Sequence, residues 1–221
     1  GYNNTAVGWE SMKANTTGAL NVAVGQQAML ANTTGDKNVC VGHNTLAALT
    51  TADNNTAIGD NALSANTTGA DNTAVGANAL DANTTAAYNA AFGKDALTAN
   101  TTGTENTSIG TFSMVNSTTG SFNTALGAGA LFSSQTGADN VAIGLEAMRN
   151  TTASDNTAVG YRALKESDGA GNTGIGHSAG IAITSGATNT AVGKSSLTTC
   201  TTGSHNTVMG ASAGFGITTG S

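Results

Sequence analysis

Residues 55–71 read NTAIGDNALSANTTGAD, and this stretch decides the fold because close copies of it recur along the whole chain. An Asn followed four residues later by a Gly occurs 13 times in 221 residues. Ten of the 12 spacings between copies are 17 residues, and two are 16. Self-similarity at a fixed period is typical of repeat architectures. The chain is therefore predicted to be a stack of similar units.

Two columns of the repeat hold a single residue type throughout. The Asn column is Asn4, Asn21, Asn38, Asn55, Asn72, Asn89, Asn106, Asn123, Asn140, Asn156, Asn172, Asn189 and Asn206. The Gly column is Gly8, Gly25, Gly42, Gly59, Gly76, Gly93, Gly110, Gly127, Gly144, Gly160, Gly176, Gly193 and Gly210. We interpret the Asn residues as a structural amide ladder at a turn, because Asn tolerates left-handed backbone and amides can bond between stacked coils. The Gly residues fit a structural turn with positive φ or close approach between coils.

The repeat favours strands over helices. Seventeen residues are not a whole number of 3.6-residue turns, and Thr, Asn, Gly and Val are mediocre or poor helix formers. Short β-branched runs between Asn and Gly indicate strands. We therefore predict an all-β parallel β-solenoid (β-roll) of 13 coils, mainly 17 residues each, with 1–221 as one repeat domain. Both shorter spacings place a deletion after the Ala-Leu pair, within 150–155 and 165–171, which marks that stretch as a turn. The Asn-Thr-Ala-Val-Gly and Ala-Leu segments keep their register, as strands would.

The apolar columns predict a core and a partner. The column that begins at Val7 is large and apolar in every copy, and the column that begins at Met12 is similar, so both are predicted to form the core. The column that begins at Ala6 is small and uncharged, and it lies on the opposite face of the strand. A strand that is apolar on both faces is normally buried on both. The Ala face is therefore expected to pack against further copies, most simply as a trimer about the long axis. The alternative is a lone solenoid whose Ala residues tolerate solvent.

Composition argues against several functions. The chain has 9% charged residues, a net charge of −6 and only seven Lys and Arg, which cannot make a nucleic-acid surface. No segment approaches the ~20 apolar residues of a membrane-spanning helix. No catalytic motif occurs, so we predict no catalysis, no cofactor and no metal site. His43, His177 and His205 are assigned to solvated turns.

Cysteine and carboxylate positions also point to structural roles. Cys40 and Cys200 lie nine coils apart, too far for a disulfide in a solenoid, and Cys40 fits a small core position. The carboxylates near the end of the repeat lack the regular acidic periodicity of calcium-binding β-rolls.

The Asn-Thr-Thr turn allows two further hypotheses. Paired threonines such as Thr33 and Thr34 form an outward hydroxyl stripe, which suggests ice or polysaccharide binding. The preferred interpretation is a turn held by Thr hydroxyl bonds. The same turn creates apparent N-glycosylation sequons, which we interpret as an accident of composition. They begin at Asn15, Asn32, Asn66, Asn83, Asn100 and elsewhere.

The unit N-T-A-V-G-x-x-A-L resembles the head repeats of trimeric autotransporter adhesins (YadA-like heads), and similar repeats occur in phage and phage-like tail fibres. The resemblance covers essentially the whole chain. It implies a left-handed parallel β-roll, three chains around an axis, display outside the cell, and surface binding. The period here is longer than is usual in those heads, and no neck, stalk or anchor segment is present.

Together these features predict a structural or adhesive segment of an extracellular trimeric fibre, an excerpt of a longer fibre without caps. The expected partners are further copies of the chain, possibly as an extended filament, and an unidentified surface receptor or glycan. One alternative is a receptor-binding tail fibre of a phage or injection system. Another is a monomeric solenoid that binds ice or glycan.

Overall fold

The computed structural model describes residues 1–220, and it consists of three-residue strands joined by long turns. The strands are β1 (Thr5–Val7), β2 (Val22–Val24), β3 (Val39–Val41), β4 (Thr56–Ile58), β5 (Thr73–Val75), β6 (Ala90–Phe92), β7 (Thr107–Ile109), β8 (Thr124–Leu126), β9 (Val141–Ile143), β10 (Thr157–Val159), β11 (Thr173–Ile175), β12 (Thr190–Val192) and β13 (Thr207–Met209). No helix occurs in the described residues. The predicted all-β class is confirmed.

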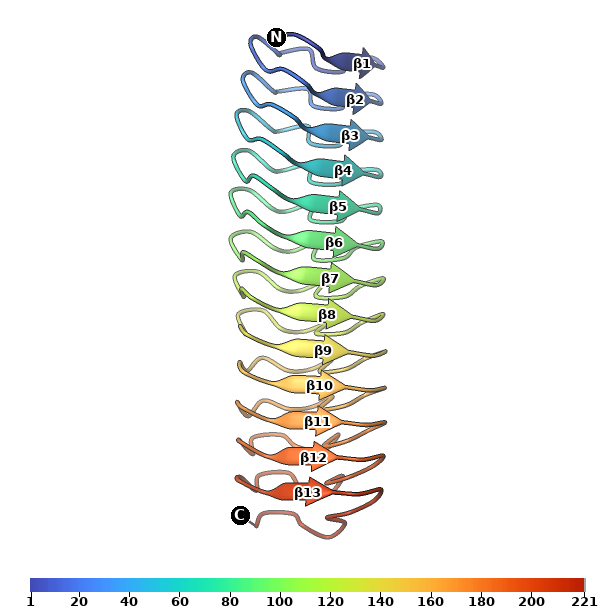
Figure 1. The fold of residues 1–221 in the computed structure, drawn as a ribbon, viewed down its shortest axis with the longest axis vertical. Coiled ribbons are helices and arrows are strands. Elements are labelled where there is room, and N and C mark those ends of the chain that lie inside the picture. Colours follow the sequence, from blue (N-terminus) through green and yellow to red (C-terminus); the bar gives the residue numbers. More distant parts are fainter. Residues whose placement is uncertain (221) are drawn as a thin grey trace. The chain divides into compact units, whose positions relative to one another are not determined.

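The chain divides into two compact units, Gly1–Asn106 with β1 to β6 and a second unit that begins at Thr107 with β7 to β13. Within each unit, strands that follow one another in sequence are neighbours in a parallel sheet (Figure 1). Ala57 pairs with Ala74, and Ala158 pairs with Gly174, so the register steps by one repeat from coil to coil. The structure therefore confirms a parallel β-solenoid with about 17 residues per turn.

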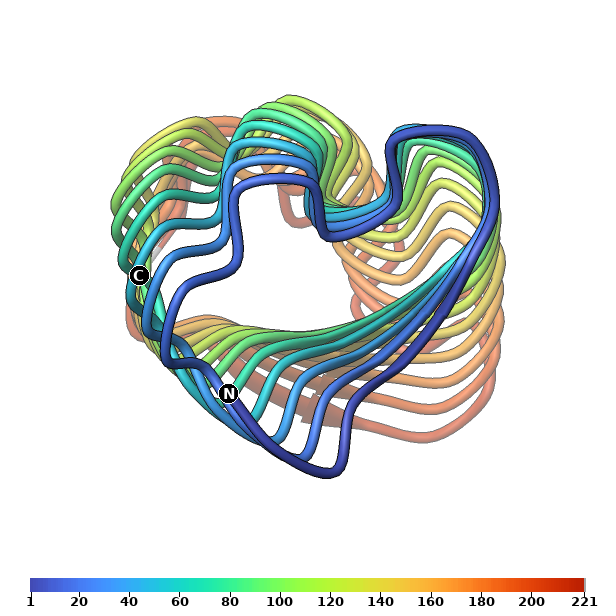
Figure 2. The ribbon, with the colours of Figure 1, turned by 90° about the horizontal axis from the view of Figure 1, so that it is seen from above.

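The backbone of each coil loops around an interior (Figure 2). The Met and Leu residues of the predicted second core column are buried in it. Those that are fully buried are Met29, Leu46, Leu63, Leu80, Leu97, Met114, Leu131, Met148, Leu164 and Leu197. The small residues of the strand also point inward, and Ala23, Ala57 and Ala74 have no exposed surface. Ala62 and Ala79, which directly precede the Leu column, are fully buried as well, so a typical coil fills its interior with one long and two short side chains.

The predicted position of the Val7 column was wrong. Its members lie on the outer face of the strands, and Ile58 remains 40% exposed and Leu126 44% exposed. The Ala column takes the inside because the long Leu side chains reach across to the strand. At Gly174, which replaces Ala in this column, an added Cβ would lie only 2.7 Å from Cγ of Leu164. A large residue on the inner face of the strand therefore has no room.

The Ala-Leu segments were wrongly expected to be strands. They lie in turns, and Leu46, Leu63 and Leu80 have φ values of 49°, 52° and 53°, in the left-handed region. Their register is kept by backbone bonds between coils, as when the N–H of Leu46 donates to the carbonyl of Ala62 (3.1 Å). The two predicted deletion sites, 150–155 and 165–171, contain no strand, in agreement with the expected turn.

Candidate functional site

The Asn column forms a hydrogen-bonded ladder, which we call the strand ladder because each member directly precedes a strand. The backbone N–H of Asn72 donates to Oδ1 of Asn55 (3.0 Å), and Nδ2 of Asn72 donates to the carbonyl of Ala86 (2.9 Å). Asn38 repeats both bonds, to Asn21 and to Ala52. The members from Asn21 to Asn189 are buried. Their amides are used by the protein itself, so the ladder holds neighbouring coils together and offers no ligand group.

The left-handed backbone at this turn belongs to the residue before each ladder Asn. Asn54 and Asp71 have φ values of 60° and 58°, whereas Asn55 and Asn72 do not have positive φ. The expected left-handed conformation is thus displaced by one position. The ladder position instead uses the Asn amide, whose Oδ1 accepts from the backbone N–H of the next ladder Asn and whose Nδ2 donates to a backbone carbonyl, as Asn72 does to Ala86.

The Gly column needs glycine for two reasons. Its φ values run from 121° to 141°, a region that side chains rarely adopt. The coils also approach closely there, and a Cβ added at Gly76 would overlap the carbonyl of Gly93. Both the unusual φ and the close approach therefore require Gly at this corner.

A second buried column lies in the long turn, and the sequence interpretation missed it. This turn column consists of Asn15, Asn32, Leu49, Asn66, Asn83, Asn100, Ser117, Ser134, Thr151, Ser167, Ile183, Cys200 and Ile217, and all of them except Asn15 and Ile217 are buried. Nδ2 of Asn66 donates to the carbonyl of Gly69 (2.8 Å), and the N–H of Gly69 donates back to Oδ1 of Asn66 (3.1 Å). The sequence did contain a sign that this column is buried: Leu49, Ile183 and Cys200 occur among its polar members. Leu, Ile and Cys are among the residues most often buried and are uncommon in exposed turns.

Burial of the turn column bears on two sequence hypotheses. The sequon residues Asn32, Asn66 and Asn83 have no exposed surface, so their amide nitrogens are shielded from modification in the folded chain. The Oγ1 of Thr33 donates to the carbonyl of Thr50 in the next coil (3.0 Å), whereas Thr34 is exposed. In this pair the first Thr holds the turn and the second presents its hydroxyl to solvent.

In each unit, the outer face of the sheet forms an extended surface that carries no charged side chain. The column from Val7 to Met209 has no buried member among the described residues. Next to it on the same face runs a column of Thr, Val and Ala that begins at Thr5. Neither column contains a charged residue. A contiguous apolar surface of this kind marks an interaction site in many proteins.

The remaining chemistry-bearing residues do not converge on one site. Nδ1 of His43 lies 2.8 Å from Oδ1 of Asp60 at the surface, and His177 packs on the ring of Tyr161. Cys40 and Cys200 are free and buried, and burial raises the pKa of the Cys40 thiol to about 12. Residues 1–220 contain no cluster of three or more His, Cys, Asp or Glu side chains placed to hold a metal ion. Over the same residues, no helix has the length and apolar character to cross a membrane.

Comparison with models of protein families, with curated proteins and with solved structures gives no match. The resemblance to adhesin head repeats therefore rests on the motif itself, and the functional argument rests on the geometry of the coil.

Proposed function

We propose that this chain is a structural and adhesive segment of an extracellular fibre in which identical copies pack through the outer face of the sheet, most simply as a trimer about the long axis. The observation that carries the proposal is the outward column of Val, Ile, Phe, Leu and Met on strands where solvent favours polar residues. The outer face replaces the Ala face as the packing surface. The left-handed coil and the display outside the cell come from the resemblance alone.

Self-association fits this surface better than an unrelated partner does. The column repeats once per coil, and parallel strands are spaced by about 4.8 Å. A second copy carries a surface with the same period, so every coil can make the same contact. Homo-oligomers of this kind are usually closed by a symmetry axis. Packing around an axis also covers the apolar face and leaves the turns, which carry the charged residues, accessible to solvent.

The mass of the particle in solution tests the proposal. One chain has a mass of 21.5 kDa, and we expect sedimentation equilibrium to give three times that value. The double variant Ile58→Glu, Leu126→Glu places like charges together in the interface and is expected to shift the particle to single chains. The matched control Thr68→Glu, Thr119→Glu places the same charges on exposed turns and is expected to keep the trimer. A stable single chain for the unmodified protein would contradict the proposal and favour the monomeric solenoid.

A further inference from the structure

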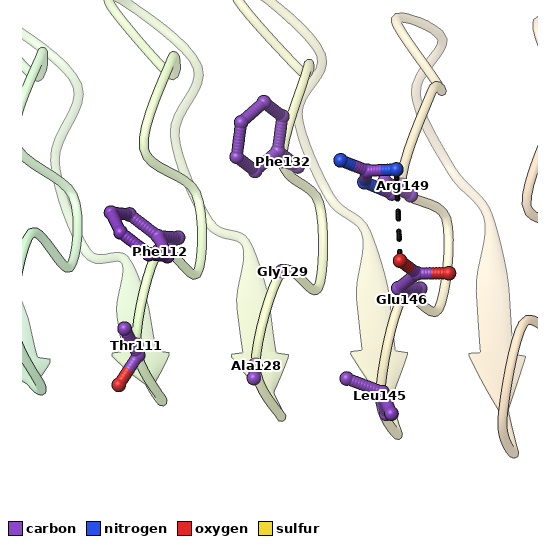
Figure 3. A pocket seen from close by; sticks show the side chains of 8 residues that line it. All are labelled: Thr111, Phe112, Ala128, Gly129, Phe132, Leu145, Glu146 and Arg149. Carbon is purple, nitrogen blue, oxygen red and sulfur yellow. Dashed lines mark ion pairs between the residues drawn. The ribbon is translucent and has the colours of Figure 1, made fainter.

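One coil of the second unit departs from the repeat and creates a hollow of about 210 Å³. Gly129 occupies a column in which Asn44, Asn61 and Asn78 stand in other coils, all with positive φ. Because Gly129 has no side chain, a gap opens between Phe112 in the preceding coil and Glu146 in the following coil. Figure 3 shows Gly129 in the middle of this gap, with the labelled side chains around it.

Apolar and charged groups surround the hollow together. Phe112, 43% exposed, and Thr111 stand on one side, with Leu145, 51% exposed, on the other (Figure 3). The guanidinium of Arg149 lies over the ring of Phe132, 5.1 Å from its centre. The chain has five Phe and two Arg in all, so two of the five Phe and one of the two Arg line this single hollow.

The polar groups of the hollow are held in place. Glu146 accepts from Nε of Arg162 (2.6 Å), and Nη1 of Arg149 lies 3.6 Å from Oε1 of Glu146. The hydrogen bond from Arg162 lowers the pKa of Glu146, so the carboxylate is ionised at neutral pH. The hollow therefore offers fixed acceptors and donors at one edge and aromatic surface beside them.

We propose that this hollow binds one neutral pyranose ring of a glycan. The C–H face of a pyranose packs against the electron-rich face of an aromatic ring, and its hydroxyls both donate and accept. Phe112 and Phe132 supply the aromatic surface, Glu146 the acceptor and Arg149 the donors. An apolar ligand would make no use of Glu146 and Arg149, which already pair with each other, and an acidic sugar would bring its carboxylate next to that of Glu146. The volume lies below the 300–1,000 Å³ of pockets for drug-sized ligands, and it suits a single ring.

This inference deepens the proposed function, because it names the ligand class of an adhesive segment. A hollow this shallow is expected to bind one sugar only weakly, with a dissociation constant of about millimolar. Several copies in one fibre would present the hollow repeatedly, and multivalent contact then raises the strength of attachment. A weak single site is thus sufficient for a fibre.

Saturation-transfer NMR with methyl glycosides of glucose, galactose, mannose and N-acetylglucosamine, and with glucuronate, tests the proposal. We expect transfer to the ring protons of at least one neutral glycoside. The variant Gly129→Asn restores the residue of Asn44, Asn61 and Asn78, and its Cβ would meet only Cγ of Glu146, at 4.0 Å. It should fold normally and lose binding about tenfold or more. Phe132→Leu keeps the apolar volume, removes the ring face and should weaken binding several-fold.

The matched control is Asn61→Gly, which opens the same gap in the first unit between Asn44 and Asn78, where that column has no aromatic ring. It is expected to leave binding unchanged and to add no second site. Absence of transfer to every neutral glycoside, binding of glucuronate alone, or equal binding by Gly129→Asn would overturn the proposal. Because the probes are monovalent, these outcomes do not depend on the number of copies in the particle, so a failed trimer and a failed sugar site are distinguishable.

Discussion

The strand ladder and the turn column are both buried and polar, yet the strand ladder is Asn in all 13 copies while the turn column changes freely. In the first unit the turn column is Asn except at Leu49, and in the second unit it contains Ser, Thr, Ile and Cys. Both deletions also fall directly after turn-column members, Thr151 and Ser167. Burial alone therefore does not decide which residue a column requires.

The difference lies in what each amide connects. Asn72 of the strand ladder bonds to Asn55 in the preceding coil and, through its Oδ1, to the N–H of Asn89 in the following coil (3.0 Å). The side chain of Asn66 in the turn column exchanges two bonds with the backbone of Gly69 in its own turn. From the next coil its Oδ1 accepts a side-chain bond, from Nδ2 of Asn83 (3.1 Å), and, among the described residues, no backbone N–H of that coil. A buried backbone N–H that bonds to the neighbouring coil needs an acceptor at a fixed height in every coil, whereas the turn can also be held by apolar packing, as at Leu49. This contrast gives four predictions.

The largest expected effect is that of Asn72→Ala. This substitution leaves the buried N–H of Asn89 without the Oδ1 acceptor and removes the bond to Ala86. We expect the free energy of unfolding to fall by about 2–4 kcal/mol, since an orphaned buried group costs about 1–3 kcal/mol beyond the lost bonds. Urea denaturation followed by circular dichroism measures it. Thr68→Ala on an exposed turn of the neighbouring coil is the control, and an equal loss there would contradict the role of the ladder.

The second prediction concerns pH and the thiol of Cys40, which lies in β3 two residues after the ladder member Asn38. Burial raises the pKa of Cys40 from 9.0 to about 12, so the folded chain keeps a proton that the unfolded chain releases above pH 9. The stabilisation is complete below pH 9, and the free energy of unfolding falls as pH rises towards 12, by about 1.4 kcal/mol per pH unit from this thiol. Cys40→Ala, which restores the residue of its column, should flatten this alkaline slope. Denaturation at a series of pH values measures it, and an unchanged slope in Cys40→Ala would refute the assignment.

A smaller effect is expected from Asn66→Leu in the turn column. The bonds to Gly69 and the bond from Nδ2 of Asn83 are lost, but a buried Leu gains about 2 kcal/mol of apolar burial. Leu49 shows that the column accepts a Leu. We expect a loss of about 1 kcal/mol, clearly below that of Asn72→Ala in the same denaturation assay. The comparison between the two regions fails if Asn66→Leu is the more damaging of the pair.

The smallest effect should be a gain. The hydroxyls of Ser117 and Ser134 are buried and have no hydrogen-bond partner among the described residues, because Ser is shorter than the Asn of the first unit. Ser134→Asn is expected to restore the bonds within the turn and to raise the free energy of unfolding by about 0.5–1 kcal/mol. A rise in the thermal midpoint, measured beside Thr119→Asn on an exposed turn, checks this. A lower thermal midpoint for Ser134→Asn would contradict the prediction and show that the turn has no room for an Asn side chain at position 134.

The coil could be predicted from the sequence because the 17-residue repeat keeps Asn and Gly at fixed positions. Such a repeat is expected when one strand and its turns stack in register from coil to coil. The Asn and Gly residues of the candidate structural columns were found for the same reason. The hollow at Gly129 could not be found in this way. A missing side chain has meaning only when its neighbours in the preceding and following coils, Phe112 and Glu146, are known to flank it.

The sequence by itself determined the parallel coil, its length and the columns that stack, because each column is visible as a periodic letter. Only the tertiary structure decided which face of the strand lies inside. Alternation shows that Ala57 and Ile58 point in opposite directions, but both are apolar, so the pattern does not say which one enters the core. The Leu side chains fill the interior, leave space only for small residues such as Ala, and turn the larger residue outward to the surface through which we propose that copies assemble.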